Sequence, residues 1–374
     1  MEILERAQEL ERAGTDIVHL EVGEPDFDCP ACVTQAAEAA VRCGKTHYTH
    51  SLGNIALRSA ISDYYRTRYR VEVDPGRILV TTGSSGALTL LMALLLDPGD
   101  SVLLPDPGYA CYPNFIRAFH GQPVYFPVDE ADGYAYQVAE IAAQRTPRTR
   151  AVLVNSPANP TAAIQSRETL RSLVELGIPV ISDEIYHGLE YGVRAPSLLE
   201  VTDRGFVLDG FSKRYAMTGW RIGWLVAPGE CVPALQRLQQ NLYICAGSVA
   251  QEAALAALRG AEADVGRMRA EYDRRRLDLL DGLRRLNLGV AVEPRGAYYV
   301  LADARHLDPD SRRLAHRILE EAHVGVAPGV DFGTRAEGRL RFSFAASASR
   351  IAEGLDRLEG WLRRMSFRPS LAGM

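Results

Sequence analysis

Short runs of apolar residues alternate with longer helix-like segments through most of this chain. The runs predicted to be strands lie at residues 78–82, 101–104, 151–155, 180–184 and 205–209. Strands that are apolar along their whole length are buried on both faces, and strands that alternate with helices are typical of a parallel sheet covered by helices. The pattern therefore predicts an α/β fold with a mostly parallel sheet.

The two ends of the chain follow a different pattern. The first residues are predicted to form an amphipathic helix, and residues 17–22 a short strand. After a charged helical stretch at 261–286, residues 290–300 and 339–345 have the pattern of strands in a smaller α+β domain. We therefore expect a large domain at residues 33–270, and a small domain formed by residues 1–32 and 271–374.

Composition and charge narrow the function classes. The chain has 374 residues, of which 47% are hydrophobic and 24% charged, as in ordinary globular proteins with a large core. A net charge of −5 argues against a nucleic-acid or anionic-membrane partner. The longest apolar run, residues 87–96, is too short to span a bilayer and is predicted to be a buried helix. With no apolar signal region at the N-terminus, we expect a cytoplasmic protein.

Six cysteines fit a reducing compartment. Cys29 and Cys32 have the spacing of a redox or zinc motif, but no thioredoxin-like pattern precedes them and no second such pair follows. We interpret them as two small residues at the start of a helix, and we expect no metal site.

Lysine is almost absent. Lys45 and Lys213 are the only two lysines among 42 basic residues, so arginine is used wherever a positive charge is sufficient. A primary amine can lose its proton near neutral pH and form a Schiff base with a carbonyl, which a guanidinium cannot do. We treat Lys45 as a solvated charge. Lys213 lies in the distinctive stretch 209–223, and we interpret it as the covalent anchor of an aldehyde cofactor, pyridoxal phosphate.

The motifs around Lys213 share a position in the predicted fold. Each follows the carboxyl end of a strand, where ligands bind in open α/β sheets. From Gly23 to about Ala345 they resemble, in order, those of class I/II aminotransferases, members of the fold-type I pyridoxal-phosphate enzymes. This resemblance implies transfer of an amino group from an L-amino acid to a 2-oxo acid by a ping-pong mechanism, in a homodimer.

The resemblance implies roles around the cofactor ring. Lys213 matches the Schiff-base lysine, which also moves the substrate proton. Asp183 matches the carboxylate that keeps the pyridine nitrogen protonated, and strand alternation sends its neighbour Glu184 to the other side. Tyr186 and Asn159 match the pair that hydrogen-bonds the 3′-oxygen. Tyr109 matches an aromatic ring against the pyridine face.

The same resemblance implies a phosphate site. Ser84 and Ser85 lie in a Gly-Ser-Ser-Gly sequence at a predicted helix N-terminus, which favours anions. Arg221, eight residues after Lys213, matches an arginine that clamps the phosphate. Relatives often have a phosphate-binding serine at the position of Gly210, so either Ser212 replaces it or one donor is missing. Tyr48 matches a tyrosine supplied across the dimer interface.

On the substrate side, Arg341 matches the arginine that binds the α-carboxylate, and Arg339 on the same predicted strand is the alternative. The other substrate contacts that the resemblance implies are Gly23, Asn159, Tyr298 and the loop at 327–333.

Two other functions stay open at this point. A carbon–sulfur β-lyase of the same fold would use the same residues but expel a β-substituent. A ligand-sensing domain of a transcription regulator would need a DNA-binding module, for which we expect no room before Gly23 or after Ala345. The identity of the donor and acceptor is not predicted by any motif.

Overall fold

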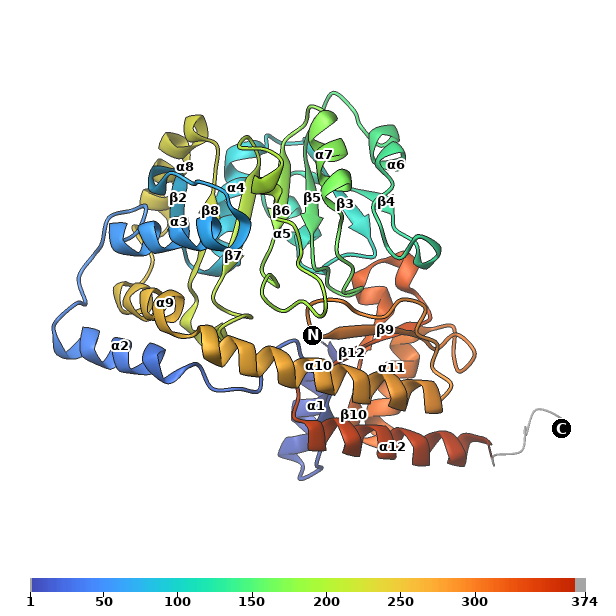
Figure 1. Cartoon of the computed structure of the whole chain (residues 1–374). Coiled ribbons are helices and arrows are strands. Elements are labelled where there is room, and N and C mark those ends of the chain that lie inside the picture. Colours follow the sequence, from blue (N-terminus) through green and yellow to red (C-terminus); the bar gives the residue numbers. More distant parts are fainter. Residues whose placement is uncertain (1, 367–374) are drawn as a thin grey trace.

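The computed structural model describes residues 2–366, and its centre is a seven-stranded sheet (Figure 1). The strands lie in the order β2-β8-β7-β6-β5-β3-β4. Their bounds are Ile78–Thr81 (β2), Ser101–Asp106 (β3), Gln122–Pro127 (β4), Thr149–Asn155 (β5), Val180–Asp183 (β6), Phe206–Gly210 (β7) and Gly223–Val226 (β8). Only β8 runs antiparallel to its neighbours. The predicted, mostly parallel sheet is confirmed, with β4 and β8 as strands that the sequence pattern did not reveal.

Alternate residues of each strand enter separate hydrophobic cores on the two faces of the sheet. In β5, for example, Val152 and Val154 face one core while Leu153 faces the other. One face is covered by α4 (Gly83–Leu95), α5 (Tyr112–Ala118) and α8 (Val232–Leu242), and the other by α3 (Ile55–Tyr69), α6 (Val138–Ala143) and α7 (Arg167–Glu175). This two-sided burial explains why the strands are apolar throughout.

A smaller body lies beyond one end of the sheet (Figure 1). It contains an antiparallel sheet in the order β11-β12-β9, and a parallel pair of β1 with β10. The strands are Val18–His19 (β1), Tyr299–Asp303 (β9), Val324–Gly325 (β10), Ala327–Pro328 (β11) and Arg339–Ser343 (β12). Their helices are α1 (Glu2–Arg12), α11 (Ser311–Ala322) and α12 (Ala348–Ser366). The parallel pairing of β1 with β10 joins the N-terminal segment to the C-terminal part of the chain.

Two of the predicted strands are shorter than expected. The strand expected at 17–22 is only β1, and the strand expected at 290–300 begins at Tyr299. Pro294 lies in the missing part and has no N–H for a strand hydrogen bond, so a regular ladder is not available there.

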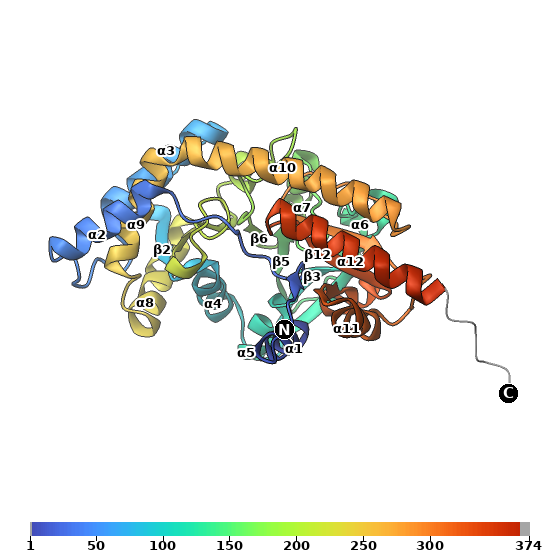
Figure 2. The ribbon, with the colours of Figure 1, turned by 90° about the horizontal axis from the view of Figure 1, so that it is seen from below.

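Helix α10 (Glu262–Arg285) runs along both bodies (Figures 1 and 2). It follows α9 (Ser248–Gly260), which packs on α2 (Ala31–Arg42), and its other end packs on α12. The predicted domain boundary at residue 270 falls inside α10, and the division into two domains stays a prediction. None of the helices within residues 2–366 has the length and apolar character needed to cross a membrane.

Candidate active site

A cavity of about 330 Å³ lies where the carboxyl ends of the central strands meet the smaller body. The large sheet contributes residues that follow β3, β5, β6 and β7, together with the first turn of α4. The smaller body contributes Arg341 from β12, residues after β1, and the start of α1. The cavity is therefore at the strand ends where the sequence predicts the ligand.

Lys213 lies three residues after β7 and its side chain is largely buried in this cavity. Its Nζ donates a hydrogen bond to the carbonyl oxygen of Gly23 at 2.7 Å. The pKa of the Lys213 amine is lowered to about 8, mainly by burial and also by the positive charges of Arg341 and Arg221, against the opposing attraction of Glu24. About a tenth of the amine is thus uncharged at pH 7, and the uncharged form is the nucleophile.

Asp183, the last residue of β6, faces the same cavity. Its Oδ2 accepts a hydrogen bond from the Tyr112 hydroxyl at 2.7 Å, and its Oδ1 accepts one from the Ile185 N–H at 3.1 Å. Burial raises the pKa of Asp183 to about 6, because these neutral donors and the more distant Lys213 compensate only part of the desolvation. The carboxylate is held in a fixed orientation and is suited to a cationic partner.

The first turn of α4 forms one end of the cavity. Ser84 and Ser85 line the cavity, and the first N–H groups of a helix have no partner within the helix, so this end attracts anions. The Arg221 guanidinium lies against the same turn, since a Cβ added to Gly83 would be 2.8 Å from its Nη2. Gly83 has a φ of 67°, which glycine adopts without strain.

Glycines bring β7 and β8 close to this turn. A Cβ on Gly223 would lie 3.1 Å from the backbone nitrogen of Ser84, and a Cβ on Gly210 would lie 3.2 Å from the Gly223 Cα. A serine at position 210 would therefore require the strands to shift. Ser212 is buried beside Lys213, outside the cavity lining.

Arg341 occupies the opposite wall and is only 7% exposed. Its Nη1 donates to the side-chain oxygen of Asn159 at 2.9 Å, and its Nη2 donates to the backbone oxygen of Glu21. The guanidinium carbon lies 4.3 Å from the ring centre of Tyr299 and 4.6 Å from that of Phe332. Its buried Nε has no hydrogen-bond partner among residues 2–366. A planar cation held between two rings is well placed to bind a planar carboxylate.

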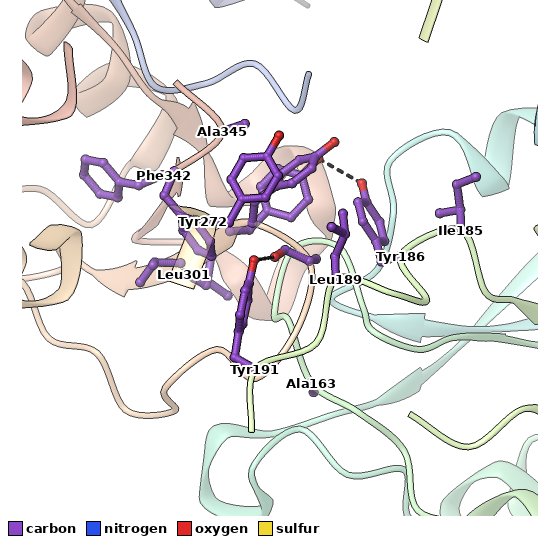
Figure 3. Close-up of a cluster of buried hydrophobic side chains, with 14 of the residues drawn as sticks. Ala163, Ile185, Tyr186, Leu189, Tyr191, Tyr272, Leu301, Phe342 and Ala345 are labelled. Carbon is purple, nitrogen blue, oxygen red and sulfur yellow. Dashed lines mark hydrogen bonds between the residues drawn. The ribbon is translucent and has the colours of Figure 1, made fainter. Parts of the chain in front are cut away.

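Tyrosine side chains connect the two bodies beside the cavity. The hydroxyls of Tyr186 and Tyr299 lie 2.9 Å apart, and Tyr298 donates to the carbonyl oxygen of Gly23 at 2.9 Å. Figure 3 shows Tyr186 in the segment after β6, with Tyr272 of α10 in the same cluster. Tyr299, rather than the predicted Tyr298, lines the cavity.

The structure brings together most of the predicted site residues. Those that line the cavity are Gly23, Ser84, Ser85, Tyr109, Asn159, Asp183, Tyr186, Lys213 and Arg341. Those outside its lining are Tyr48, Ser212, Arg221 and Tyr298. The Tyr48 side chain is on the surface and 80% exposed. Arg339 is also outside, because its guanidinium pairs with Glu130 at 2.8 Å.

Sequence reasoning missed several lining residues, chiefly Tyr112, Asn155, Tyr299, Ile3 and Leu4. Tyr112 is only three residues after the predicted Tyr109, at the start of α5, and the centres of the two rings lie 5.1 Å apart. Asn155 connects two predicted residues, since it donates to the Asp183 carbonyl at 3.2 Å and accepts from the Asn159 N–H at 2.8 Å. No local signal marks Ile3 and Leu4, because they reach the cavity only through tertiary packing.

Lys45, Cys29 and Cys32, the other residues considered for a chemical role, lie outside the cavity lining. Lys45 is exposed and pairs with Glu252 at 2.9 Å. Cys29 and Cys32 are free thiols, as are the four other cysteines. Within residues 2–366, no cluster of three or more His, Cys, Asp or Glu side chains has an arrangement that could bind a metal ion.

Comparison with known proteins identifies the family. The family model described as aminotransferase class I and II matches residues 15–358. The chain belongs to this family. It is 38% identical to the (5-formylfuran-3-yl)methyl phosphate transaminase of Methanocaldococcus jannaschii, covering 97% of this chain and 96% of that one. It is 37% identical to a valine–pyruvate aminotransferase of Mycobacterium tuberculosis, covering 97% and 95%.

Solved structures of aminotransferases have the same fold. Aspartate aminotransferase from Thermus thermophilus with maleate superimposes with a TM-score of 0.91 at 38% identity, over 95% of this chain and 94% of that one. The protein is a pyridoxal-phosphate-dependent aminotransferase of fold type I, and none of these comparisons favours a β-lyase.

The residues of the cavity fit this cofactor. A largely buried amine can bind the aldehyde, a buried carboxylate without a full counter-charge can pair with the pyridinium, and a helix N-terminus with two serines and an arginine can hold the phosphate. The amine, the carboxylate and the two serines line the same cavity as Arg341, and Arg221 lies against the α4 turn beside it.

Proposed function

We propose that Lys213 holds the cofactor and carries the substrate proton during transfer of an amino group from an L-amino acid to a 2-oxo acid. When bound, pyridoxal phosphate supplies an aldehyde that combines with amines and a ring that accepts negative charge from the α-carbon. The lowered pKa of the Lys213 amine supports its role, because the uncharged amine can take up a proton from the α-carbon. The observation that carries this proposal is that Lys213, Asp183 and Arg341 line the same cavity.

Asp183 is proposed to hold the ring nitrogen in its protonated form. Its two hydrogen bonds, from Tyr112 and Ile185, fix the carboxylate in one orientation. Tyr186 and Asn159 are proposed to donate to the 3′-oxygen, and Tyr109 to pack against the ring face. All three of these side chains line the cavity beside Asp183.

The phosphate is proposed to bind the first turn of α4, where Ser84, Ser85 and Arg221 supply donors and positive charge. Ser212 is proposed as a further donor, and its burial beside Lys213 supports that role.

At the other wall, Arg341 is proposed to bind the α-carboxylate of both substrates. Its hydrogen bonds to Asn159 and to the backbone of Glu21 hold the guanidinium in place, which reduces the entropy cost of binding. Gly23 and Tyr298 are proposed to support this wall. The carbonyl oxygen of Gly23 accepts hydrogen bonds from both the Tyr298 hydroxyl and the Lys213 amine.

The two-lysine composition allows a direct test. The cofactor-loaded enzyme is reduced with borohydride and its peptides are mapped, and we expect the label on the peptide that contains Lys213 and none on that with Lys45. Addition of single amino acids without an oxo acid should convert the cofactor to its amine form without release of ammonia. A label confined to Lys45 would refute the role of Lys213, and stoichiometric ammonia release would refute transamination.

We also propose that the enzyme is a homodimer in which Tyr48 reaches the phosphate of the neighbouring subunit. Tyr48, Ile55, Leu242 and Ile244 are all exposed by 47% or more, which is unusual for large apolar side chains. They belong to one region, because Gln236 and Gln240 of α8 bond to Ser51, and Gln251 of α9 bonds to Thr49. This apolar region is suited to pairing with a second copy of the chain.

A mixed dimer distinguishes the two possible positions of Tyr48. Lys213→Ala and Tyr48→Ala subunits are co-expressed with different tags, and the mixed dimer is isolated. If Tyr48 acts across the interface, one of the two sites has both residues intact, so about half of the wild-type activity should return. Activity no higher than that of the Tyr48→Ala homodimer would show that Tyr48 acts within its own subunit or not at all.

Finally, we propose that the enzyme works in the cytoplasm. The free state of all six cysteines is consistent with a reducing compartment. A tagged chain expressed in its native host and fractionated should appear with cytoplasmic markers.

A further inference from the structure

At the substrate end of the cavity, apolar side chains surround the charged Arg341. Apart from Arg341, the wall away from the α4 turn is mostly apolar. It contains Ile3 and Leu4 from α1, Val22 after β1, and Pro328 and Phe332 from the segment that follows β10. The amino-acid side chain must point into this part when Arg341 holds the α-carboxylate and Lys213 faces the α-carbon.

Positive charge is scarce in the cavity lining. Among residues 2–366 of one subunit, the cationic side chains that line the cavity are Lys213 and Arg341, and both have roles in the proposed function. Glu21, Asp331 and Asp183 are its acidic residues. In the described part of one subunit, the lining at the substrate end therefore includes two acidic residues and no cation beyond the one required for the α-carboxylate.

Glu21 is the more deeply buried of the two acids at this end. Its side chain is 5% exposed, and its Oε1 lies 2.6 Å from the Nδ1 of His19. Its Oε2 is buried and has no hydrogen-bond partner among residues 2–366. Asp331 lies 3.4 Å from the exposed Arg312, which is outside the lining. His19 and Arg312 thus pair with Glu21 and Asp331, and neither of these two basic side chains lines the cavity.

We infer that this aminotransferase prefers amino and 2-oxo acids with one carboxylate and an apolar side chain, and that it discriminates against four-carbon dicarboxylates such as aspartate. This inference rests on the proposed roles of Lys213 and Arg341. A second carboxylate only one carbon beyond the α-carbon would be confined within the cavity, close to Glu21 or Asp331. It would lose its hydration without gaining a counter-ion, whereas a leucine or phenylalanine side chain would gain apolar contacts.

The relatives do not decide this point, because their names cover different substrates at the same level of identity. The Mycobacterium tuberculosis protein is named for valine and pyruvate, and the Thermus thermophilus protein for aspartate. The residues that line the cavity of the present chain favour apolar substrates, like those in the name of the Mycobacterium tuberculosis protein.

The first test compares donors on the cofactor-loaded wild-type enzyme. Half-reaction rates are measured by cofactor absorbance with leucine, phenylalanine and aspartate. We expect kcat/KM for the better apolar donor to exceed that for aspartate by at least about 100-fold, the scale on which a hydrophobic pocket rejects a more polar side chain of similar size. A kcat/KM for aspartate within tenfold of the values for leucine and phenylalanine would overturn the inference. This outcome would also be found if a partner subunit supplied a cation for the second carboxylate.

A second measurement does not depend on turnover. The loaded enzyme is titrated with 4-methylpentanoate, 3-phenylpropanoate and maleate, and binding is followed by calorimetry. We expect at least one monocarboxylate to bind about tenfold more tightly than maleate. Tighter binding of maleate would contradict the inference even if no donor tested were a physiological substrate.

A charge introduced at the apolar wall provides a gain-of-function test. Leu4 of α1 lines the cavity, and Leu4→Arg adds a guanidinium there; Gln8→Arg adds the same charge on an exposed position of the same helix. We expect Leu4→Arg to raise the ratio of aspartate to leucine turnover at least about tenfold and Gln8→Arg to leave it unchanged. Equal ratios in both variants would show that this wall does not set the specificity.

The failure of this inference differs from failure of the proposed function. If Lys213 did not hold the cofactor, borohydride would not label its peptide and no donor would react. If only the specificity were wrong, the label would be present and aspartate would react as fast as leucine.

Discussion

The two ends of the active-site cavity are built in different ways. At the cofactor end, Asp183 and Lys213 lie at or just after neighbouring strands of one sheet, and Ser84 lies in the helix that follows a third. At the substrate end, Leu4, Val22, Phe332 and Arg341 come from separate segments at the two ends of the chain. The first end is polar and hydrogen-bonded, and the second combines apolar side chains and two acidic residues with one guanidinium.

This difference suggests that the cofactor end determines the reaction and the substrate end determines which substrates are accepted. The ends of adjacent parallel strands have a fixed spacing, so the groups there can be positioned for one reaction. The substrate end is closed by a short helix and by loops, whose side chains can change without disturbing the sheet. We therefore expect substitutions at the cofactor end to slow all substrates alike, and those at the substrate end to change binding and selectivity.

The largest effect is expected for Lys213→Ala. Loss of both the attachment point and the proton carrier should lower kcat by about 10⁴-fold or more with every donor. The measurement is the single-turnover rate of cofactor-loaded protein, with Lys45→Ala as the matched control. A similar loss in Lys45→Ala, or more than a tenth of wild-type activity in Lys213→Ala, would break the comparison.

Asp183→Asn should have the next largest effect. The amide keeps the size of the side chain but removes the negative charge that supports a protonated ring nitrogen, so kcat should fall about 10² to 10³-fold, equally for different donors. The neighbouring Glu184→Gln is the control, because its side chain packs behind the site. A loss that depended strongly on the donor would place Asp183 at the substrate end instead.

Arg341→Lys tests the substrate end. The lysine keeps the charge but loses the planar two-point contact, so KM should rise about 10²-fold for all substrates while kcat changes less. Arg339→Lys, on the same strand but paired with Glu130, should leave KM within about twofold. An equal rise in KM in both variants would mean that Arg339 shares the carboxylate.

The rate of cofactor attachment to the empty protein should depend on pH. The pKa of the Lys213 amine is lowered to about 8, so the reactive uncharged fraction falls about tenfold for each pH unit below this value. Rates measured by stopped-flow absorbance from pH 6 to pH 9 should rise and level off near pH 8. A midpoint above pH 10 would show that the amine is not buried as described.

Glu184→Gln should change stability rather than chemistry. Burial raises the pKa of Glu184 to about 8, so the folded protein retains this proton after the unfolded chain has lost it. Wild-type stability should then decrease, relative to the variant, by about 1.4 kcal/mol per pH unit between about pH 4.5 and pH 8. Urea unfolding of the cofactor-free proteins measures this, with the exposed Glu140→Gln as the control. A pH-independent difference would mean that Glu184 is ionised in the folded state.

Much of the cofactor end could be predicted because its residues are close to motifs in the sequence. Lys213 was marked by the scarcity of lysine, Asp183 by its resemblance to the family's aspartate at the end of a predicted strand, and Ser84 by its Gly-Ser-Ser-Gly sequence before an apolar helix. The choice between Tyr298 and Tyr299 could not be made in this way. Two adjacent residues at the start of a strand differ only in which side they face, and the predicted start of that strand was several residues too early.

By itself, the sequence determined the parallel sheet, the positions of its carboxyl ends and the residues that follow them, because hydrophobic periodicity and turn residues are local properties. The tertiary structure alone decided that Leu4 and Phe332 face the same cavity as Arg341, and that Arg339 pairs with Glu130 outside it. Contacts between residues more than 300 positions apart depend on how the whole chain packs, and no local pattern encodes them.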